Sequence, residues 1–402
     1  MGTVFATGLG TGVDGAAAAR GAVGQAREKF GEGQIDLVLL YSSSQYEYPS
    51  TVSTVRELTG GAPLIGCSTA GEFTESDVAL GSVAVSFIRS DDIRFFTGLA
   101  ENIDEDPETA LGNIMTKIPL EVPGYPHRCI LMLTDGMVGN GEEITLLVSH
   151  VAGPGAKIVG GLAADDFKMK QTVVFHNDRV TEKAASICVM ASKKPFFTSV
   201  NHGHRPMTAP MKITRAVGNV LHEVDGRPAW EVWKDHTTAD AAEMGIDLDQ
   251  ISDSGDVAIY FSNFELGLHI GEGQYKVRYP MSINEDGSIN FTCTIPEAAR
   301  MCIMDGRDEQ RQIQASRDAA EQVKLAARQA GYEKFAGGIV IECAVRQYLL
   351  GDRFPLAPRA IGEVLGEDTP LIGAELYGEM RLEPGEFSGY HNTTTVVLLL
   401  PE

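Results

Sequence analysis

A strand–helix–strand–turn–strand pattern occurs three times along the chain, and this repeat constrains the fold more than any other feature. The copies begin at the apolar runs 36–41, 128–136 and 337–346, and a helix-like stretch follows each run. Each copy then reaches a glycine turn (PLIGCSTAGE, AKIVGGLAADD or PLIGAELYGE) and ends in another apolar strand. Short β-branched and aliphatic runs bounded by Gly and Pro are typical of strands buried on both faces. The pattern predicts an α/β fold built from related units.

The order of elements within one unit predicts mixed sheets. A helix between two strands allows a parallel crossover, and the strand after the turn can return antiparallel. We therefore expect a layered α-β-β-α sandwich made of two intertwined domains, residues 1–225 and 226–402. The boundary falls near HEVDGRPAW, where a strand-like run ends and a helix-like run begins.

Three further segments have clear local signals. Residues 3–10 resemble an opening strand, and NEDGSI carries a hairpin signal between two short strands. The alanine-rich segment 309–330 predicts a helix that begins at Asp305 or Asp308 and stops at Gly331.

Aligning the three glycine turns places one glycine and one acid in register. The aligned glycines are Gly66, Gly160 and Gly373, and the acids six residues further on are Glu72, Asp166 and Glu379. A glycine there fits a positive φ or the close approach of another segment. The acids can line one site and clamp a ligand amine or a metal, or they can repeat one structural hydrogen bond. We favour the structural interpretation, since duplication also copies structural solutions.

The first turn contains reactive side chains that the other two copies lack. GCSTAG resembles a nucleophile elbow, but it is not GxSxG, and the following element predicts a strand rather than a helix. A hydrolase that uses Cys67 or Ser68 is therefore the alternative hypothesis. We expect Cys67, Ser68 and Thr69, together with Glu72, to line a ligand pocket rather than to attack a substrate.

A glycine motif follows the opening strand. Residues Gly10 to Gly15 (GTGVDG) match GxGxxG between a strand and a helix, as in dinucleotide-binding folds. The second strand of such a fold ends in an acid that binds the ribose, whereas this one ends in Tyr41 and three serines. A nucleotide-dependent enzyme is thus a second form of the enzyme alternative.

Histidines stand out at two positions. In NHGHRP, an extended chain places His202 and His204 on one face, where they can hold a metal or one can serve as a haem ligand. No third metal ligand is adjacent in sequence, and His391 lies in another polar segment at a strand start. The alternative for each is a hydrogen-bonded loop histidine.

Charge and composition narrow the classes of partner. A net charge of -22 repels nucleic-acid phosphates and anionic lipid, so we expect neither as a partner. We find no signal peptide and no apolar run of the ~20 residues that span a bilayer. The six cysteines lie mostly in apolar runs without a CxxC pair, which favours buried, reduced thiols in a cytoplasmic protein.

Three arginines are flanked by residues that we expect to be buried, namely Arg205, Arg227 and Arg346. A buried arginine must be paired. Its partner can be a structural carboxylate such as Glu72, Glu375 or Glu379, or it can be the carboxylate of a ligand.

Taken in order, the motifs resemble the FIST family of prokaryotic sensory proteins. They are LIGCSTAGEF, VGGLAADD, HGHRP, VDGRPAWEVW, ECAVRQYLLG, PLIGAELYGEM and HNTTTVVLLL, and they cover about 36–400. The resemblance implies a cytoplasmic sensor of small ligands, with amino acids as the proposed ligand class. Members function with chemotaxis, histidine-kinase or cyclic-dinucleotide signalling modules. Since we find no output module in this sequence, we expect the protein to signal through such a partner.

A stand-alone branch of the family resembles haem proteins that sense nitric oxide. The family pattern commonly has an aromatic residue where His204 stands, so His202 is the residue carried over as a haem ligand, and the departure at His204 leaves either histidine open. We therefore expect a sensor that binds an amino-acid-like molecule, or haem and nitric oxide, rather than an enzyme. The residues expected to bind ligand are Cys67, Ser68, Thr69, Glu72, Arg205, Arg346, Glu379 and His391.

Overall fold

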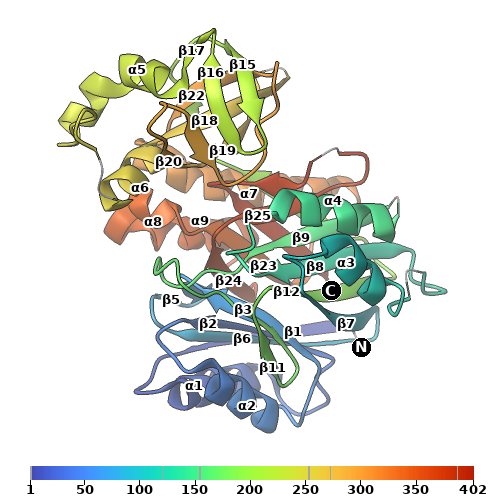
Figure 1. The fold of residues 1–402 in the computed structure, drawn as a ribbon. Helices are drawn as coiled ribbons and strands as arrows, with labels where there is room; N and C mark the ends of the chain where they lie inside the picture. The colour runs from blue at the N-terminus through green and yellow to red at the C-terminus, as the bar shows by residue number, and fades with distance from the viewer. Residues whose placement is uncertain (1, 120, 154, 252–253, 272, 387) are drawn as a thin grey trace.

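The computed structural model describes residues 2–119, 121–153, 155–251, 254–271, 273–386 and 388–402. Within these residues the strands form four sheets, three of six strands and one of nine (Figure 1). The six-stranded sheets mix parallel and antiparallel pairs, whereas the pairs of the nine-stranded sheet are antiparallel. The predicted α/β class with mixed sheets is confirmed.

The three repeats are three units of the same order, and an inserted unit interrupts the third. The first unit contains β1 (Thr3–Gly10), α1 (Gly15–Phe30), β2 (Leu37–Ser43), α2 (Tyr48–Leu58), β3 (Leu64–Thr69), β4 (Glu72–Thr74), β5 (Val78–Ala79) and β6 (Val83–Ser90). The second contains β7 (Ile93–Glu101), α3 (Pro107–Met115), β8 (His127–Thr134), α4 (Gly141–Ala152), β9 (Ala156–Leu162), β10 (Val174–His176), β11 (Arg179–Thr181) and β12 (Ala184–Ser192).

The third unit and the inserted unit complete the chain. The third contains β13 (Phe197–Asn201), α7 (Glu309–Gln329), β23 (Phe335–Cys343), α8 (Arg346–Leu350), η1 (Gly351–Arg353), α9 (Leu356–Leu365), β24 (Leu371–Leu376), β25 (Glu379–Leu382), β26 (Tyr390–His391) and β27 (Thr395–Pro401). The inserted unit contains β14 (Arg205–Pro206), β15 (Met211–Val217), β16 (Val220–Val224), β17 (Arg227–Pro228), α5 (Ala229–Glu243), α6 (Ser254–Asn263), β18 (Phe264–Gly271), β19 (Gln274–Arg278), β20 (Pro280–Ile283), β21 (Ile289–Phe291) and β22 (Arg300–Asp305).

The three units exchange strands in a ring. In each unit the central strand pairs parallel with the next strand and antiparallel with the last one: β2 with β3 and β6, β8 with β9 and β12, β23 with β24 and β27. The strand after each glycine turn joins another unit, because β4 pairs with β24, β10 with β3 and β25 with β9. Backbone hydrogen bonds therefore interlock the two halves of the chain.

The aligned glycines are explained by the close approach of other segments. A Cβ atom on Gly66 would collide with the carbonyl oxygen of Leu40 on the parallel neighbour, and one on Gly160 with that of Met132. At Gly373 the space is taken by the ring of Phe73, which arrives on the exchanged strand β4. A side chain at any of the three positions would thus push paired strands apart.

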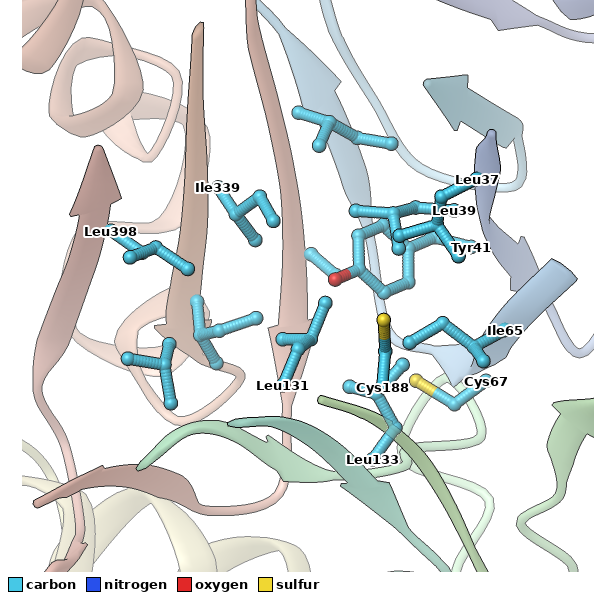
Figure 2. Packing of buried hydrophobic residues seen from close by; sticks show 14 of the residues in the cluster. Leu37, Leu39, Tyr41, Ile65, Cys67, Leu131, Leu133, Cys188, Ile339 and Leu398 are labelled. Atoms are coloured by element: carbon cyan, nitrogen blue, oxygen red, sulfur yellow. The ribbon is translucent and has the colours of Figure 1, made fainter. Parts of the chain in front are cut away.

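One hydrophobic core lies between all three six-stranded sheets. Figure 2 shows Ile65, Leu131 and Leu398, one from each sheet, pointing into it. Three sheets thus share the core, where the sequence predicted two layers of a sandwich. All six cysteines are free and buried, as predicted, and Cys67 and Cys188 lie in this core.

Helices cover the outer faces of the sheets, and the inserted unit lies at one end of the molecule. Helices α1 and α2 pack on the first sheet, α3 and α4 on the second, and α7 and α9 on the third (Figure 1). The Asp308 side chain caps α7, and Gly331 follows its end with a φ of 87°. Both signals were predicted, as was the NEDGSI hairpin between β20 and β21.

Candidate functional site

A cleft of about 750 Å³ lies between the inserted unit and the three-sheet core. One side is formed by β18 and β19 of the inserted unit, with the segment 200–206 that leads into it. The other side is formed by α7, by the β25–β26 connection and by Thr394 before β27. The cleft is therefore built from segments far apart in the sequence, where two parts of the fold meet.

The charged side chains around this cleft are mostly basic. They include one carboxylate, Glu386, and four basic groups, Arg205, Lys276, Arg311 and Arg381. The whole chain has 55 acidic residues and 33 Lys and Arg residues, so acids outnumber bases in the chain, whereas bases outnumber acids around the cleft. A cleft with this lining concentrates small anions from solution.

Two of these cations have no carboxylate partner among the described residues. The Nζ of Lys276 donates to the carbonyl oxygen of Ser388 at 2.6 Å and to its Oγ at 2.8 Å, and both acceptors are neutral. The guanidinium of Arg311 has no carboxylate partner among the described residues. Arg311 is exposed and lines the cleft. Burial and the nearby Arg278 lower the pKa of Lys276 to about 7.

The other two cations are held in ion pairs. Arg205 lies 3.2 Å from Asp305, and Arg381 lies 2.6 Å from Glu386 and 3.5 Å from Glu383. These pairs fix the positions of both guanidinium groups beside the cleft. They leave Lys276 and Arg311 as the basic side chains that an incoming anion can contact.

The three predicted histidines, His202, His204 and His391, all contact this cleft. The Nε2 atom of each ring donates to a backbone carbonyl: that of His202 to Tyr275 at 3.0 Å, that of His204 to Ser262 at 3.3 Å, and that of His391 to Arg381 at 3.1 Å. Burial lowers the pKa of all three, that of His204 to about 3. The rings are therefore neutral at pH 7, and the buried Nδ1 of His202 has no partner in the described chain.

This arrangement does not fit axial ligation of haem. An imidazole ligates iron through a free ring nitrogen, commonly Nε2, and in His202 and His204 that atom is occupied by a carbonyl. The cleft also has few aliphatic side chains to pack on a porphyrin, chiefly Val200, Ile270 and Val277. The residues present suit a small polar anion better than haem.

The first glycine turn lies away from the cleft. Cys67, Ser68 and Thr69 are fully buried, so none has exposed surface with which to contact a ligand. Burial and Glu72 raise the pKa of the Cys67 thiol well above its usual value, which is the opposite of an activated nucleophile. Ser68 Oγ accepts a hydrogen bond from Val173 N at 3.0 Å. The side chains predicted to line a pocket are instead part of the scaffold.

In two of the three units the aligned acid repeats one structural hydrogen-bonding pattern. Glu72 accepts hydrogen bonds from the backbone and hydroxyl of Ser82, just before β6. Glu379 accepts the equivalent pair from Thr394, just before β27, at 3.0 and 2.9 Å. Asp166 differs, because its carboxylate reaches the first unit and binds Ser44 N at 2.7 Å. Glu379 therefore lies directly behind Thr394, which lines the cleft.

Two of the arginines predicted to be buried are exposed. The side chain of Arg205 is 54% exposed and that of Arg227 is 50% exposed, because both lie on two-residue strands at the rim of the inserted unit. Arg227 pairs with Asp235 on α5.

Arg346 is fully buried as predicted, but its partner differs from the carboxylates that we proposed. It pairs at 2.6 Å with Glu342 near the end of β23, and donates to Gln312 and Ser316. These contacts within the scaffold use its guanidinium, and Arg346 does not line the cleft.

The GxGxxG glycines have a packing role. A Cβ atom on Gly10 would collide with the Ala18 carbonyl of α1, and one on Gly15 with Thr51 of α2. Strand β1 pairs with β6, which separates it from β2, whereas a dinucleotide-binding fold pairs its first strands directly. The motif thus brings helices close to the sheet.

Three basic cleft residues were missed in the sequence, namely Lys276, Arg311 and Arg381. The segment QYKVR offered a signal, because strand alternation places Lys276 and Arg278 on one face. Arg311 in the first turn of the clearest helix gave no signal, since surface arginines are common there.

The fold is thus an α/β core of interlocked units, with an inserted sheet and a polar cleft between the two. The chain belongs to the FIST family: the FIST N domain matches residues 36–227, and the FIST C domain matches residues 230–381. FIST domains are associated with sensing in signal transduction, and the family is sensory rather than enzymatic. None of the helices in the described ranges is long and apolar enough to span a bilayer.

The similar proteins and structures do not narrow the function further. The chain is 28% identical over 176 residues to the uncharacterized protein MJ1623 of Methanocaldococcus jannaschii, over 42% of this chain and 34% of that protein. It thus spans about a third of that relative's length. A crystal structure of cyanuric acid hydrolase from A. caulinodans aligns with 48% of this chain and 72% of that chain, at 9% identity and a TM-score of 0.27.

Proposed function

We propose that this protein is a sensor whose ligand is a small carboxylate, of the size and chemistry of an amino acid, bound in the cleft. Arg311 would bind the carboxylate through charge-assisted hydrogen bonds. Lys276 would donate a hydrogen bond to the ligand beside it. Glu386 would accept a hydrogen bond from an amino group. A ligand with both groups would thus complete the polar lining.

One observation carries this proposal. In a chain of net charge -22, Lys276 and Arg311 face one cleft without a carboxylate partner among the described residues. Basic side chains in so acidic a protein find structural partners easily, and Arg381 and Arg205 beside them have done so. Two basic side chains left without an acidic partner at the same place favour an external anion as the ligand.

The position of the cleft also suggests how binding would be transmitted. Lys276 belongs to the inserted unit, whereas Arg311 and Arg381 belong to the three-sheet core. A ligand held by both sides would favour one relative position of the two parts over others. A partner protein, such as a histidine kinase, a chemotaxis protein or a cyclic-dinucleotide enzyme, would read that change.

A thermal-shift screen at low ionic strength tests the proposal. Sodium salts of small carboxylates and amino acids are compared with sodium chloride at equal ionic strength. A ligand that binds the folded state raises the unfolding temperature in a concentration-dependent manner. The proposal expects at least one carboxylate to do so with saturation, and it fails if every salt behaves like chloride.

A further inference from the structure

Lys276 has a hydrogen-bonding geometry that is unusual for a lysine. Lys276 is only 9% exposed, and its Nζ makes two hydrogen bonds, both to Ser388. The Ser388 hydroxyl donates its proton to Glu142 Oε1 at 2.9 Å, so its oxygen can only accept from Lys276. The guanidinium of Arg278 lies 2.8 Å from the same Glu142 oxygen and satisfies that carboxylate.

This network suits a neutral amine. An ammonium group has three N–H donors, and the third would have no acceptor among the described residues. A neutral amine has two N–H donors, both of which Ser388 accepts, and it keeps one lone pair. Burial and the positive charge of Arg278 act in the same direction, since both disfavour the ammonium form. Glu142 and Glu386 oppose them less strongly.

We propose that Lys276 captures small oxo acids covalently, as an imine formed with the ketone or aldehyde carbonyl of the bound ligand. The inference rests on the proposed anion site, because Arg311 would hold the carboxylate that brings the carbonyl to the amine. Lysines made nucleophilic by burial beside another cation form such imines in other proteins. The ligand class is then narrower than carboxylates in general.

The step needs no co-reactant. The nitrogen lone pair of Lys276 forms a bond to the carbonyl carbon, and the C=O π electrons move to the carbonyl oxygen. A proton passes from the nitrogen to that oxygen, with Ser388 and Glu142 as the adjacent relay, to give a carbinolamine. The C–O bond then breaks, water leaves with the second amine proton, and the C=N bond remains. Hydrolysis reverses the sequence, so the adduct is reversible.

Reductive trapping tests this inference on the full chain. The protein is incubated with pyruvate and sodium cyanoborohydride, and peptide mass spectrometry locates the reduced adduct. We expect one adduct at Lys276, with none at Lys157, which is paired with Glu383 and serves as the matched lysine control. The variant Lys276→Arg keeps the charge but cannot form an imine, so it should lose the adduct.

Lactate separates this inference from the proposed function, since it has a hydroxyl group where pyruvate has the ketone. If lactate and pyruvate both stabilise the protein but pyruvate gives no adduct at Lys276, covalent capture is refuted and the anion site stands. An adduct spread evenly over surface lysines also refutes it. If neither anion stabilises the protein and no adduct forms, both ideas lose their support.

Discussion

Lys276 on strand β19 and Ser388 before β26 are 112 residues apart in the sequence, yet a 2.8 Å hydrogen bond joins them across the cleft wall. One belongs to the inserted unit and the other to the three-sheet core. The bond therefore ties together the two parts whose relative position we expect a ligand to control. It also leaves the lysine without a counter-charge, which is the feature on which the proposed function depends.

The first prediction concerns the pH dependence of stability. Burial raises the pKa of Glu72 and of Glu379 to about 8, from 4.5 in the unfolded chain. Because the folded state holds these protons more tightly, their contribution is complete below pH 4.5 and is lost as the pH rises toward 8. The free energy of unfolding should fall by a few kcal/mol across that range.

Urea unfolding at several pH values measures this effect. The variant Glu379→Gln is neutral at every pH, so it should show a shallower decline than wild type between pH 5 and 8. Its advantage should grow as the pH rises. An equal slope in wild type, Glu72→Gln and Glu379→Gln would show that neither carboxyl is protonated in the folded state.

The second prediction concerns the glycines of the repeat. In Gly160→Ala, the new methyl group would collide with the Met132 carbonyl of the paired strand, so we expect destabilisation by more than about 3 kcal/mol. Gly24 lies within α1, and a Cβ there meets no atom within 4 Å. Gly24→Ala should therefore stabilise the protein by about 0.5–1 kcal/mol. Denaturation midpoints that move in the same direction for both variants would refute this account of the turn.

The repeat was recognisable in the sequence because its signals are local. Apolar runs, glycine turns and the helix cap at Asp308 each depend on neighbours within a few residues. The exchange of β4, β10 and β25 could not be predicted, because each of these short strands pairs with a partner chosen by tertiary packing. The predicted two-layer sandwich did not include this exchange of strands between units.

The candidate site was predictable only in part, for the same reason. His202, Arg205 and His391 were noticed because such residues are rare in this chain, and they do line one cleft. Lys276 and Arg311 resemble ordinary surface cations in sequence, and their lack of partners is visible only in three dimensions. Cys67 and Ser68 drew attention by chemistry alone, although burial in a shared core leaves them inert.

The third prediction addresses the cysteines and with them the hydrolase alternative. Since all six thiols are free and buried, none should react quickly with Ellman's reagent in the folded protein. All six should react after unfolding in guanidinium chloride. Rapid labelling of Cys67 in the native state would contradict the raised pKa of its thiol and would revive a catalytic role.

The fourth prediction addresses haem. Because the Nε2 atoms of His202 and His204 are bound to carbonyls, adding haemin should give a broad absorption spectrum without a saturable Soret band. A sharp band at one haem per chain, lost in His202→Ala, would show that the ring turns to ligate iron. That result would favour the nitric-oxide-sensing branch of the family for this protein.

The most direct test of the anion site is titration calorimetry with the best carboxylate from the thermal-shift screen. Arg311 lies in the cleft, whereas Arg317 lies on the same helix, is paired with Glu363 and does not line the cleft. Losing a charge-assisted hydrogen bond costs about 1.5–3 kcal/mol, or roughly 10- to 100-fold in Kd. We predict that weakening for Arg311→Ala and an unchanged Kd for Arg317→Ala. Equal affinities in wild type and both variants would contradict the assignment of the cleft as the ligand site.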